Sequence, residues 1–366
     1  MSESTLVPPK APARLNIPKS NNAVRISIID TTSRFSFPSH LFHTPTYKGT
    51  ERLSGPSFSF LIEHDGERVL FDLGIRKDWE NLPPGIVALA KHIGATFDIK
   101  KNVSEILEEN GIPVRDGAVD TVIWSHPHFD HIGDLTTFPT STKLVVGKGF
   151  KEGFLPAYPE NQKSDVFAHD FQDRELHEID FKQGLKIGRF DAHDYFGDGS
   201  FYLLDTPGHM VGHMCGLART TVLPPTFVFL GGDASHHAGE LRPSEYLPIP
   251  TNLVPSPIPH TVATVCPGHL FVDVHCGKSA NAPFLSMSKD FNHDLEAANW
   301  SIAGLQEFDS AENVLIIIAH DPTVEAVLDF FPKGTLNDWY EKDAGAKTRW
   351  RFLGQLEQAV QENKRQ

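Results

Sequence analysis

The 366-residue chain contains only three cysteines, Cys215, Cys266 and Cys276. So few thiols cannot form the disulfide framework of a small secreted protein, and their scarcity favours a reducing, cytoplasmic location. Long apolar runs are lacking as well, since the longest, VLIIIA at 314–319, has the length of a buried strand. The first 22 residues lack the apolar stretch that a secretory signal requires. No interaction with a membrane is therefore expected.

Positive charge is also in short supply. The chain has 33 basic against 47 acidic residues, and its formal net charge is −14. Binding to a phosphate backbone requires a basic face, so a nucleic-acid partner is not expected. An acidic protein can still hold cations locally, because a bound metal ion dominates the charge of its site. The expected partner is a small-molecule substrate, and the composition leaves a homodimer open.

The chain divides into a main domain with additions. Residues 1–22, rich in Pro, Ser, Asn and Lys, predict a flexible tail. Residues 23–325 form the main domain, within which a Pro-rich and aromatic-rich stretch at about 244–300 indicates an insertion. Residues 326–366 are expected to pack on this domain as a C-terminal extension. Strands are predicted at 23–30, 57–74 (a hairpin), 118–125, 143–150, 200–208, 226–233 and 313–321, and helices at 102–111, 288–308 and 353–363.

The segment SHPHFDHIGD, at 125–134, directly follows a predicted buried strand. Side chains two apart in an extended chain point the same way, so His126 and His128 can face one point. Asp130 and His131 follow where the chain must turn and can face a second point nearby. Two imidazoles at one point, with a carboxylate and an imidazole at the other, indicate a paired metal site.

Further ligands follow other predicted strands. His209 lies in DTPGHMVGH, Asp233 in FLGGDASHH and His320 in IIIAHD. One histidine at the end of a strand is usually just a hydrogen-bonded residue, but that reading does not account for the whole ordered set. Together with the opening segment, these residues supply five histidines and two aspartates, enough for two metals with Asp233 as the bridge.

The motifs HPHFDH, TPGH, GGD and AHD, in this order, resemble those of the metallo-β-lactamase superfamily of hydrolases over about residues 24–325. The resemblance implies an α/β fold, the four-layer αββα sandwich, with two Zn²⁺ ions per chain at one edge between the β-sheets. It assigns the first zinc to His126, His128 and His209, the second to Asp130, His131 and His320, and the bridge to Asp233. Asp72, in FDLG where relatives often have DTG, would support this cluster.

Within the superfamily, the DAS after GGD and the late AHD look most like the N-acyl-homoserine lactone lactonases and their fungal relatives, some of which open cyclic amides such as benzoxazolinones. In those lactonases a tyrosine three residues past the bridging aspartate assists the substrate carbonyl, and here that position is His236. Nuclease branches do not suit the acidic charge. Flavin-linked di-iron members usually carry glutamate at the position of His128, so redox iron is not expected.

The resulting hypothesis is a zinc-dependent lactonase or lactamase. A hydroxide bridging the two zinc ions would attack a small cyclic ester or cyclic amide, with Asp130 and His236 as catalytic residues. A thioesterase of the same superfamily is the alternative, and the intact ligand set argues against a non-catalytic scaffold. The apolar or acidic residues flanking the ligands, among them Phe129, Met214 and Glu240, suit a small neutral substrate better than a phosphate-bearing carrier.

Weaker signals have ordinary explanations. The segment CPGHLFVDVHC, at 266–276, could be interpreted as a separate zinc site or as a Cys–His nucleophile, but its spacing matches no common structural pattern, and a structural or pocket-lining role is favoured. His213 is expected to support the cluster rather than bind metal. Arg242 is expected to form a salt bridge.

Overall fold

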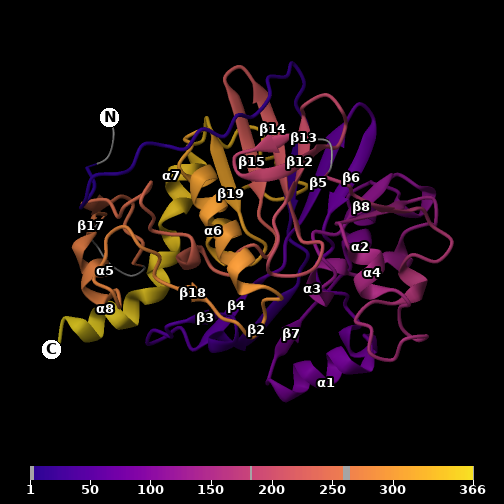
Figure 1. The fold of residues 1–366 in the computed structure, drawn as a ribbon, viewed down its shortest axis with the longest axis horizontal. Coiled ribbons are helices and arrows are strands. Elements are labelled where there is room, and N and C mark those ends of the chain that lie inside the picture. Colours follow the sequence, from indigo (N-terminus) through magenta and orange to yellow (C-terminus); the bar gives the residue numbers. More distant parts are fainter. Residues whose placement is uncertain (1–3, 182–183, 259–263, 366) are drawn as a thin grey trace.

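Two six-stranded β-sheets form the centre of the molecule in the computed structural model, which describes residues 4–181, 184–258 and 264–365 (Figure 1). The first sheet contains, in spatial order, β1 (Arg25–Ile29), β5 (Ser59–His64), β6 (Glu67–Phe71), β8 (Thr121–Ile123), β9 (Lys143–Val146) and β10 (Leu176–Glu178). The second contains β11 (Lys186–Ile187), β12 (Phe190–Asp194), β13 (Phe201–Asp205), β14 (Met214–Val222), β15 (Pro225–Leu230) and β19 (Val314–Ile317). Eight of these strands overlap predicted ones, whereas β10, β11, β12 and β14 lie on segments for which no strand was predicted.

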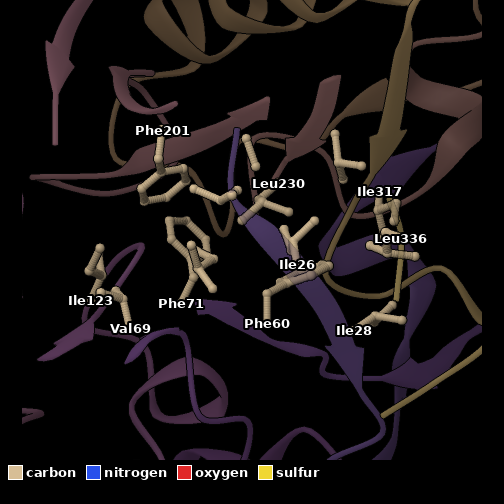
Figure 2. Close-up of a cluster of buried hydrophobic side chains, with 14 of the residues drawn as sticks. Ile26, Ile28, Phe60, Val69, Phe71, Ile123, Phe201, Leu230, Ile317 and Leu336 are labelled. Carbon is tan, nitrogen blue, oxygen red and sulfur yellow. The ribbon is translucent and has the colours of Figure 1, made fainter. Parts of the chain in front are cut away.

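Each sheet has an apolar cluster on both of its faces, and alternate side chains along a strand contribute to opposite clusters. Phe201 of β13 belongs to the apolar cluster between the sheets, whereas its neighbour Tyr202 belongs to the cluster on the outer face. In the first sheet, Phe71 of β6 likewise points inward and Leu70 outward. Figure 2 shows Phe71 and Phe201 facing one another across the interface. Contact between the apolar inner faces therefore joins the two sheets.

Helices cover the outer faces of both sheets. The longest, α6 (Leu295–Asp309), contributes Leu305 and Phe308 to the cluster that lies outside the second sheet. On the other side, α2 (Val103–Glu109) packs Leu107 against the outer face of the first sheet. The layers thus run helix, sheet, sheet, helix, and the predicted αββα sandwich is confirmed. None of the helices in the described residues is long and apolar enough to cross a membrane.

The start of α6 corrects one prediction. A helix was expected over 288–308, but residues 288–294 are not helical and α6 begins at Leu295. The carboxylate of Asp294 accepts hydrogen bonds from the backbone N–H groups of Glu296 and Ala297, both at 3.0 Å, and so caps the helix.

The remaining elements are short. The other α-helices are α1 (Pro84–His92), α3 (Phe129–Ile132), α4 (Phe150–Phe154), α5 (His269–Val274), α7 (Ala344–Arg349) and α8 (Glu357–Asn363). Small sheets join β2 (Arg34–Pro38) to β4 (Arg52–Pro56) and β7 (Thr96–Asp98), β3 (His43–Thr44) to β18 (Ser286–Met287), and β16 (Asn252–Leu253) to β17 (Cys266–Pro267). The 3-10 helices are η1 (Ser39–Leu41), η2 (Trp79–Asn81), η3 (Val114–Asp116), η4 (Leu135–Thr137), η5 (Ala168–Asp170), η6 (Ala238–Glu240), η7 (Pro322–Ala326) and η8 (Arg351–Leu356).

The additions to the main domain pack against it and against each other. Phe271 of the predicted insertion and Phe352 of the C-terminal extension share one buried cluster. The start of the described chain, where a flexible tail was predicted, runs along the molecule, and Leu15 is buried in the cluster outside the second sheet. Residues 1–3 of that tail, residues 259–263 of the insertion and residue 366 lie outside the described part of the chain.

A buried ion pair ties the loop after β15 to α6. Arg242 donates from Nε and Nη2 to the two carboxylate oxygens of Asp309, both at 2.7 Å, and from Nη1 to the carbonyl of Arg349 at 3.0 Å. The side chains of the pair are only 7% and 3% exposed. The salt bridge predicted for Arg242 is present. It fixes the far end of the loop after β15, and the predicted ligand Asp233 lies near the beginning of that loop.

Asp309→Asn should lower the free energy of unfolding by about 3 kcal/mol, because a buried guanidinium loses its counter-charge. The matched control is Asp329→Asn, which removes a partner of Lys342 from an ion pair whose side chains are 55% and 48% exposed. That change should leave the stability almost unaltered. Urea denaturation followed by tryptophan fluorescence measures both, and equal losses would contradict the role given to burial.

Candidate metal centre

The seven predicted ligands lie together where strands of the two sheets end. They form two groups, His126, His128, His209 and Asp233, and Asp130, His131, Asp233 and His320. Within each group the potential ligand atoms all lie within 4.8 Å of one another. The ligands follow β8 in the first sheet and β13, β15 and β19 in the second. Packing of the sheets against each other therefore sets the spacing of the candidate centre.

In the first group three imidazole nitrogens converge. Nε2 of His209 lies 3.2 Å from Nε2 of His126 and 2.9 Å from Nδ1 of His128, and these last two atoms are 2.9 Å apart. Oδ2 of Asp233 lies 3.7 Å from Nε2 of His126 and 3.6 Å from Nε2 of His209. Three nitrogen donors and one carboxylate oxygen are the number and kind of ligands that zinc takes.

The second group surrounds the other oxygen of the same carboxylate. Oδ1 of Asp233 lies 2.9 Å from Nε2 of His320 and 3.1 Å from Nε2 of His131. Oδ2 of Asp130 completes the group, 3.4 Å from Nε2 of His320 and 3.8 Å from Nε2 of His131. Because each oxygen of Asp233 faces one group, this carboxylate occupies the position of a bridge.

Asp72 holds the loop after β8 in place. Its carboxylate accepts hydrogen bonds from the backbone N–H of Ser125 at 2.6 Å, from Ser125 Oγ at 2.8 Å and from His131 Nδ1 at 2.8 Å. Ser125 Oγ lies 3.0 Å from Nδ1 of His126 and can accept a hydrogen bond from it. Nε2 of His126 is then left with its lone pair towards the group, and Nε2 of His131 is directed towards Asp233. Asp72 has a positive φ of 61°, a strained conformation for a residue with a side chain.

Two further contacts orient the ligands that come from the second sheet. His320 donates from Nδ1 to the carbonyl of Pro56 at 2.8 Å, which directs Nε2 towards Asp233. Gly55 allows this approach, since a Cβ there would lie 2.6 Å from the carbonyl oxygen of His320. His213 accepts the backbone N–H of Asp233 at 3.0 Å through Nε2, so it supports the group as expected rather than joining it.

The electrostatics of the site suit a divalent cation. Burial lowers the pKa of His126 and His209 well below the usual value, and that of His128 to about 4, so these imidazoles are neutral and have lone pairs to donate. Burial also acts on His131, but the carboxylates around it, Asp233 foremost, raise its pKa well above the usual value. His131 Nε2 and Asp233 Oδ1 are buried without a hydrogen-bond partner despite their proximity. Such orphaned donor atoms fit a bound metal.

A pocket of about 120 Å³ opens onto both groups. It is lined by Phe35, Phe37, Phe42, Leu53, Ile86, Leu89, Ala90, Ile93, His128, Phe129, Asp130, Asp165, His209, Asp233, His236, Phe291 and His320. The walls come from β2, α1, the loop before β10 and the loop before α6. No pattern in the sequence indicated α1 or Asp165. Of the flanking residues expected to form the walls, Phe129 does so, whereas Met214 belongs to the core between the sheets.

His236 lies in this pocket, 3.5 Å from Asp233 Oδ2 through Nε2, and both of its ring nitrogens lack a hydrogen-bond partner. Its ring packs against that of Phe42, with centroids 5.0 Å apart. Glu240, expected to be a wall residue, lies beneath the loop instead. Its Oε2 accepts the backbone N–H of His236 at 2.8 Å and the hydroxyl of Ser235 at 2.9 Å. Glu240 thus fixes the backbone that presents His236.

The segment 266–276 forms no second metal group among the described residues. Cys266 is buried, Cys276 is exposed, and His275 lies 3.1 Å from the carbonyl of Ala282 and 2.9 Å from that of Pro283 through Nε2. These contacts agree with the structural role favoured for this segment.

The chain is similar to known proteins in sequence and in structure. The model of the metallo-beta-lactamase superfamily matches residues 53–269. The chain is 44% identical to gamma-lactamase FDB1 of Fusarium pseudograminearum (strain CS3096), over 97% of this chain and 86% of that protein. It is 52% identical to gamma-lactamase MBL2 of Gibberella moniliformis (strain M3125 / FGSC 7600), over 63% of this chain and 96% of that protein. In structure it resembles an N-acyl homoserine lactone hydrolase with the product N-hexanoyl-L-homoserine at its catalytic metal centre, with a TM-score of 0.56 and 19% identity over 86% of this chain and 99% of that one.

Zinc-loaded protein, dialysed against buffer, should hold about two ions per chain. Asp233→Asn should hold one or none, because the charge facing both groups is lost. The matched control is Asp321→Asn, since Asp321 accepts the backbone N–H of Thr323 through Oδ1 and asparagine can keep that bond. Metal analysis by mass spectrometry measures all three proteins. Two ions retained in Asp233→Asn would place the bridge elsewhere.

Proposed function

This chain belongs to the metallo-β-lactamase superfamily, and on that premise we propose that it is a zinc-dependent hydrolase that opens a small cyclic ester or cyclic amide. The observation that carries the proposal is the pocket, because it opens onto both ligand groups and has mostly apolar walls. Such a pocket admits a compact ring and places its carbonyl beside the candidate metals.

The proposed ligands of one zinc are His126, His128 and His209, those of the other are Asp130, His131 and His320, and Asp233 faces both. When bound, two zinc ions supply Lewis-acid polarisation of a carbonyl oxygen and lower the pKa of water towards neutrality. Asp130 lines the pocket as well as the second group, so we assign it the orientation of the attacking water. The aromatic walls limit access of bulk water to the ring.

His236 is the proposed proton donor. It is 1% exposed, lines the pocket and has two ring nitrogens without a partner. An imidazole in this position can donate a hydrogen bond to the carbonyl oxygen, or a proton to the oxygen or nitrogen that leaves as the ring opens. Glu240 acts through the backbone of His236 and is a positioning residue.

The lining of the pocket favours a cyclic substrate over the thioester of a phosphate-bearing carrier. Among the described lining residues there is no lysine or arginine to bind phosphate, and four phenylalanines other than Phe129 contribute flat apolar surface. The relatives named gamma-lactamases, and the lactone hydrolase with a similar fold, support the same choice. A planar aromatic lactam of the benzoxazolinone type fits these walls.

The cytoplasm remains the expected location.

The choice of substrate is tested with zinc-loaded protein on a panel of aromatic lactones, aromatic lactams and acyl-CoA thioesters. Ring opening of at least one lactone or lactam should exceed thioester hydrolysis by about 10²-fold in kcat/KM, because only the cyclic substrates suit the apolar pocket. Fast thioester turnover with no ring opening would replace the proposal with the thioesterase.

His236→Ala should lower kcat by about 10²-fold with both zinc ions retained, because the variant loses a proton donor and no proposed ligand. Glu240→Ala should lower kcat less, because the variant keeps the imidazole of His236 and loses only the hydrogen bond that holds the backbone of that residue. Glu245→Ala is the control, because its carboxylate pairs with Lys10 at the surface. Full activity of His236→Ala would remove the imidazole from the mechanism.

A further inference from the structure

Asp165 is an acidic pocket residue that belongs to neither ligand group. Three carboxylates line the pocket, those of Asp130, Asp165 and Asp233, and the other two face the candidate metals. Asp165 lies in the loop between α4 and β10 and is partly buried. It therefore places an oxygen acceptor in a wall that is otherwise largely aliphatic and aromatic.

The backbone on both sides of Asp165 is fixed. Ser164 donates from Oγ to the carbonyl of Phe154 at 3.3 Å, and Tyr158 donates its backbone N–H to the carbonyl of Val166 at 3.0 Å. Val166 is fully buried in the cluster outside the first sheet. The carboxylate is thus held at the pocket by the fold and needs no ligand to bring it there.

Within the described part of the chain, Asp165 has neither a hydrogen-bond nor an ion-pair partner for its side chain. Arg76 contacts the same loop, since its guanidinium lies 5.6 Å from the ring centroid of Phe167. It pairs with other carboxylates, those of Asp78 at 2.7 Å and Asp134 at 3.6 Å. Burial raises the pKa of the Asp165 carboxyl. A carboxylate withdrawn from water without a partner is costly, so a ligand that supplies a donor gains affinity there.

We propose that Asp165 is a specificity-determining residue that accepts a hydrogen bond from an N–H or O–H group of the substrate. The inference rests on the proposed function and narrows it to cyclic esters or amides that carry a hydrogen-bond donor besides the carbonyl that reacts. The fixed negative charge disfavours anionic substrates. Phenylalanine and isoleucine side chains in the other walls offer no comparable acceptor.

Binding of rings that cannot be hydrolysed tests this assignment separately from turnover. The probes are bicyclic aromatic ketones, the positional isomers of hydroxy-2-tetralone. Each isomer is paired with its methyl ether, which lacks the hydrogen-bond donor. Isothermal titration with zinc-loaded protein should show at least one hydroxyl isomer binding about tenfold more tightly than its ether. Asp165→Leu should abolish this difference, whereas Asp165→Asn, which keeps an acceptor oxygen, should retain part of it.

Glu160→Leu is the matched control, because Glu160 is an exposed carboxylate of the same loop and should leave the difference intact. Zinc content should be equal in all four proteins. A difference that survives in Asp165→Leu would overturn the assignment, as would equal binding of every pair, or no binding of any ketone, to the unmodified protein.

Failure of the proposed function gives a different result. Dihydrocoumarins with and without the hydroxyl, which are the lactones that correspond to 2-tetralones, and the analogous lactams are offered to the same four proteins. If the ketones show the preference that depends on Asp165 but none of these rings is opened, the assignment of Asp165 stands and the hydrolysis proposal falls. If the rings are opened equally well with and without the hydroxyl, the hydrolysis proposal stands and Asp165 is not a specificity determinant.

Discussion

The hydrogen bonds of the Asp72 carboxylate are the constraint on which the candidate centre depends. They join the end of β6 to Ser125 at the end of β8 and, through His131, to the first turn of α3. Together with the backbone hydrogen bond from Leu73 N–H to the carbonyl of His131 at 2.7 Å, they fix the loop that carries four of the seven candidate ligands. The positive φ of Asp72 shows that this anchor is strained, so the surrounding contacts must stabilise it.

The second sheet supplies the other ligands by a different arrangement. There the orienting partners are the backbone carbonyl of Pro56 for His320 and the imidazole of His213 for Asp233. Because the two sets of ligands belong to different sheets, the apolar layer between the sheets controls the distance between them. Packing in the core is therefore part of the geometry of the site.

The sequence was sufficient to predict that the seven ligand candidates converge, because each candidate follows a strand with a clear apolar pattern. The αββα arrangement, in contrast, followed only from the resemblance of the motifs to the metallo-β-lactamase superfamily. The sequence was not sufficient for the pocket. Asp165, Leu89 and Phe291 come from three separate segments of the chain, and their place in one cavity depends on tertiary contacts that no local pattern records. The predicted start of α6 was wrong because residues 288–294 were included in the helix, whereas Asp294 caps it and α6 begins at Leu295. The metal roles themselves remain a prediction.

The position of β19 has a consequence for synthesis of the chain. This strand lies at the edge of the second sheet, pairs with β15 alone among the described strands and carries His320 at its end. A nascent chain has made every donor of the first group once Asp233 has been added, but the second group stays one imidazole short until His320 emerges. The first ligand group is thus complete before the second as the chain is synthesised. A metal ion bound early would meet the three histidines of the first group.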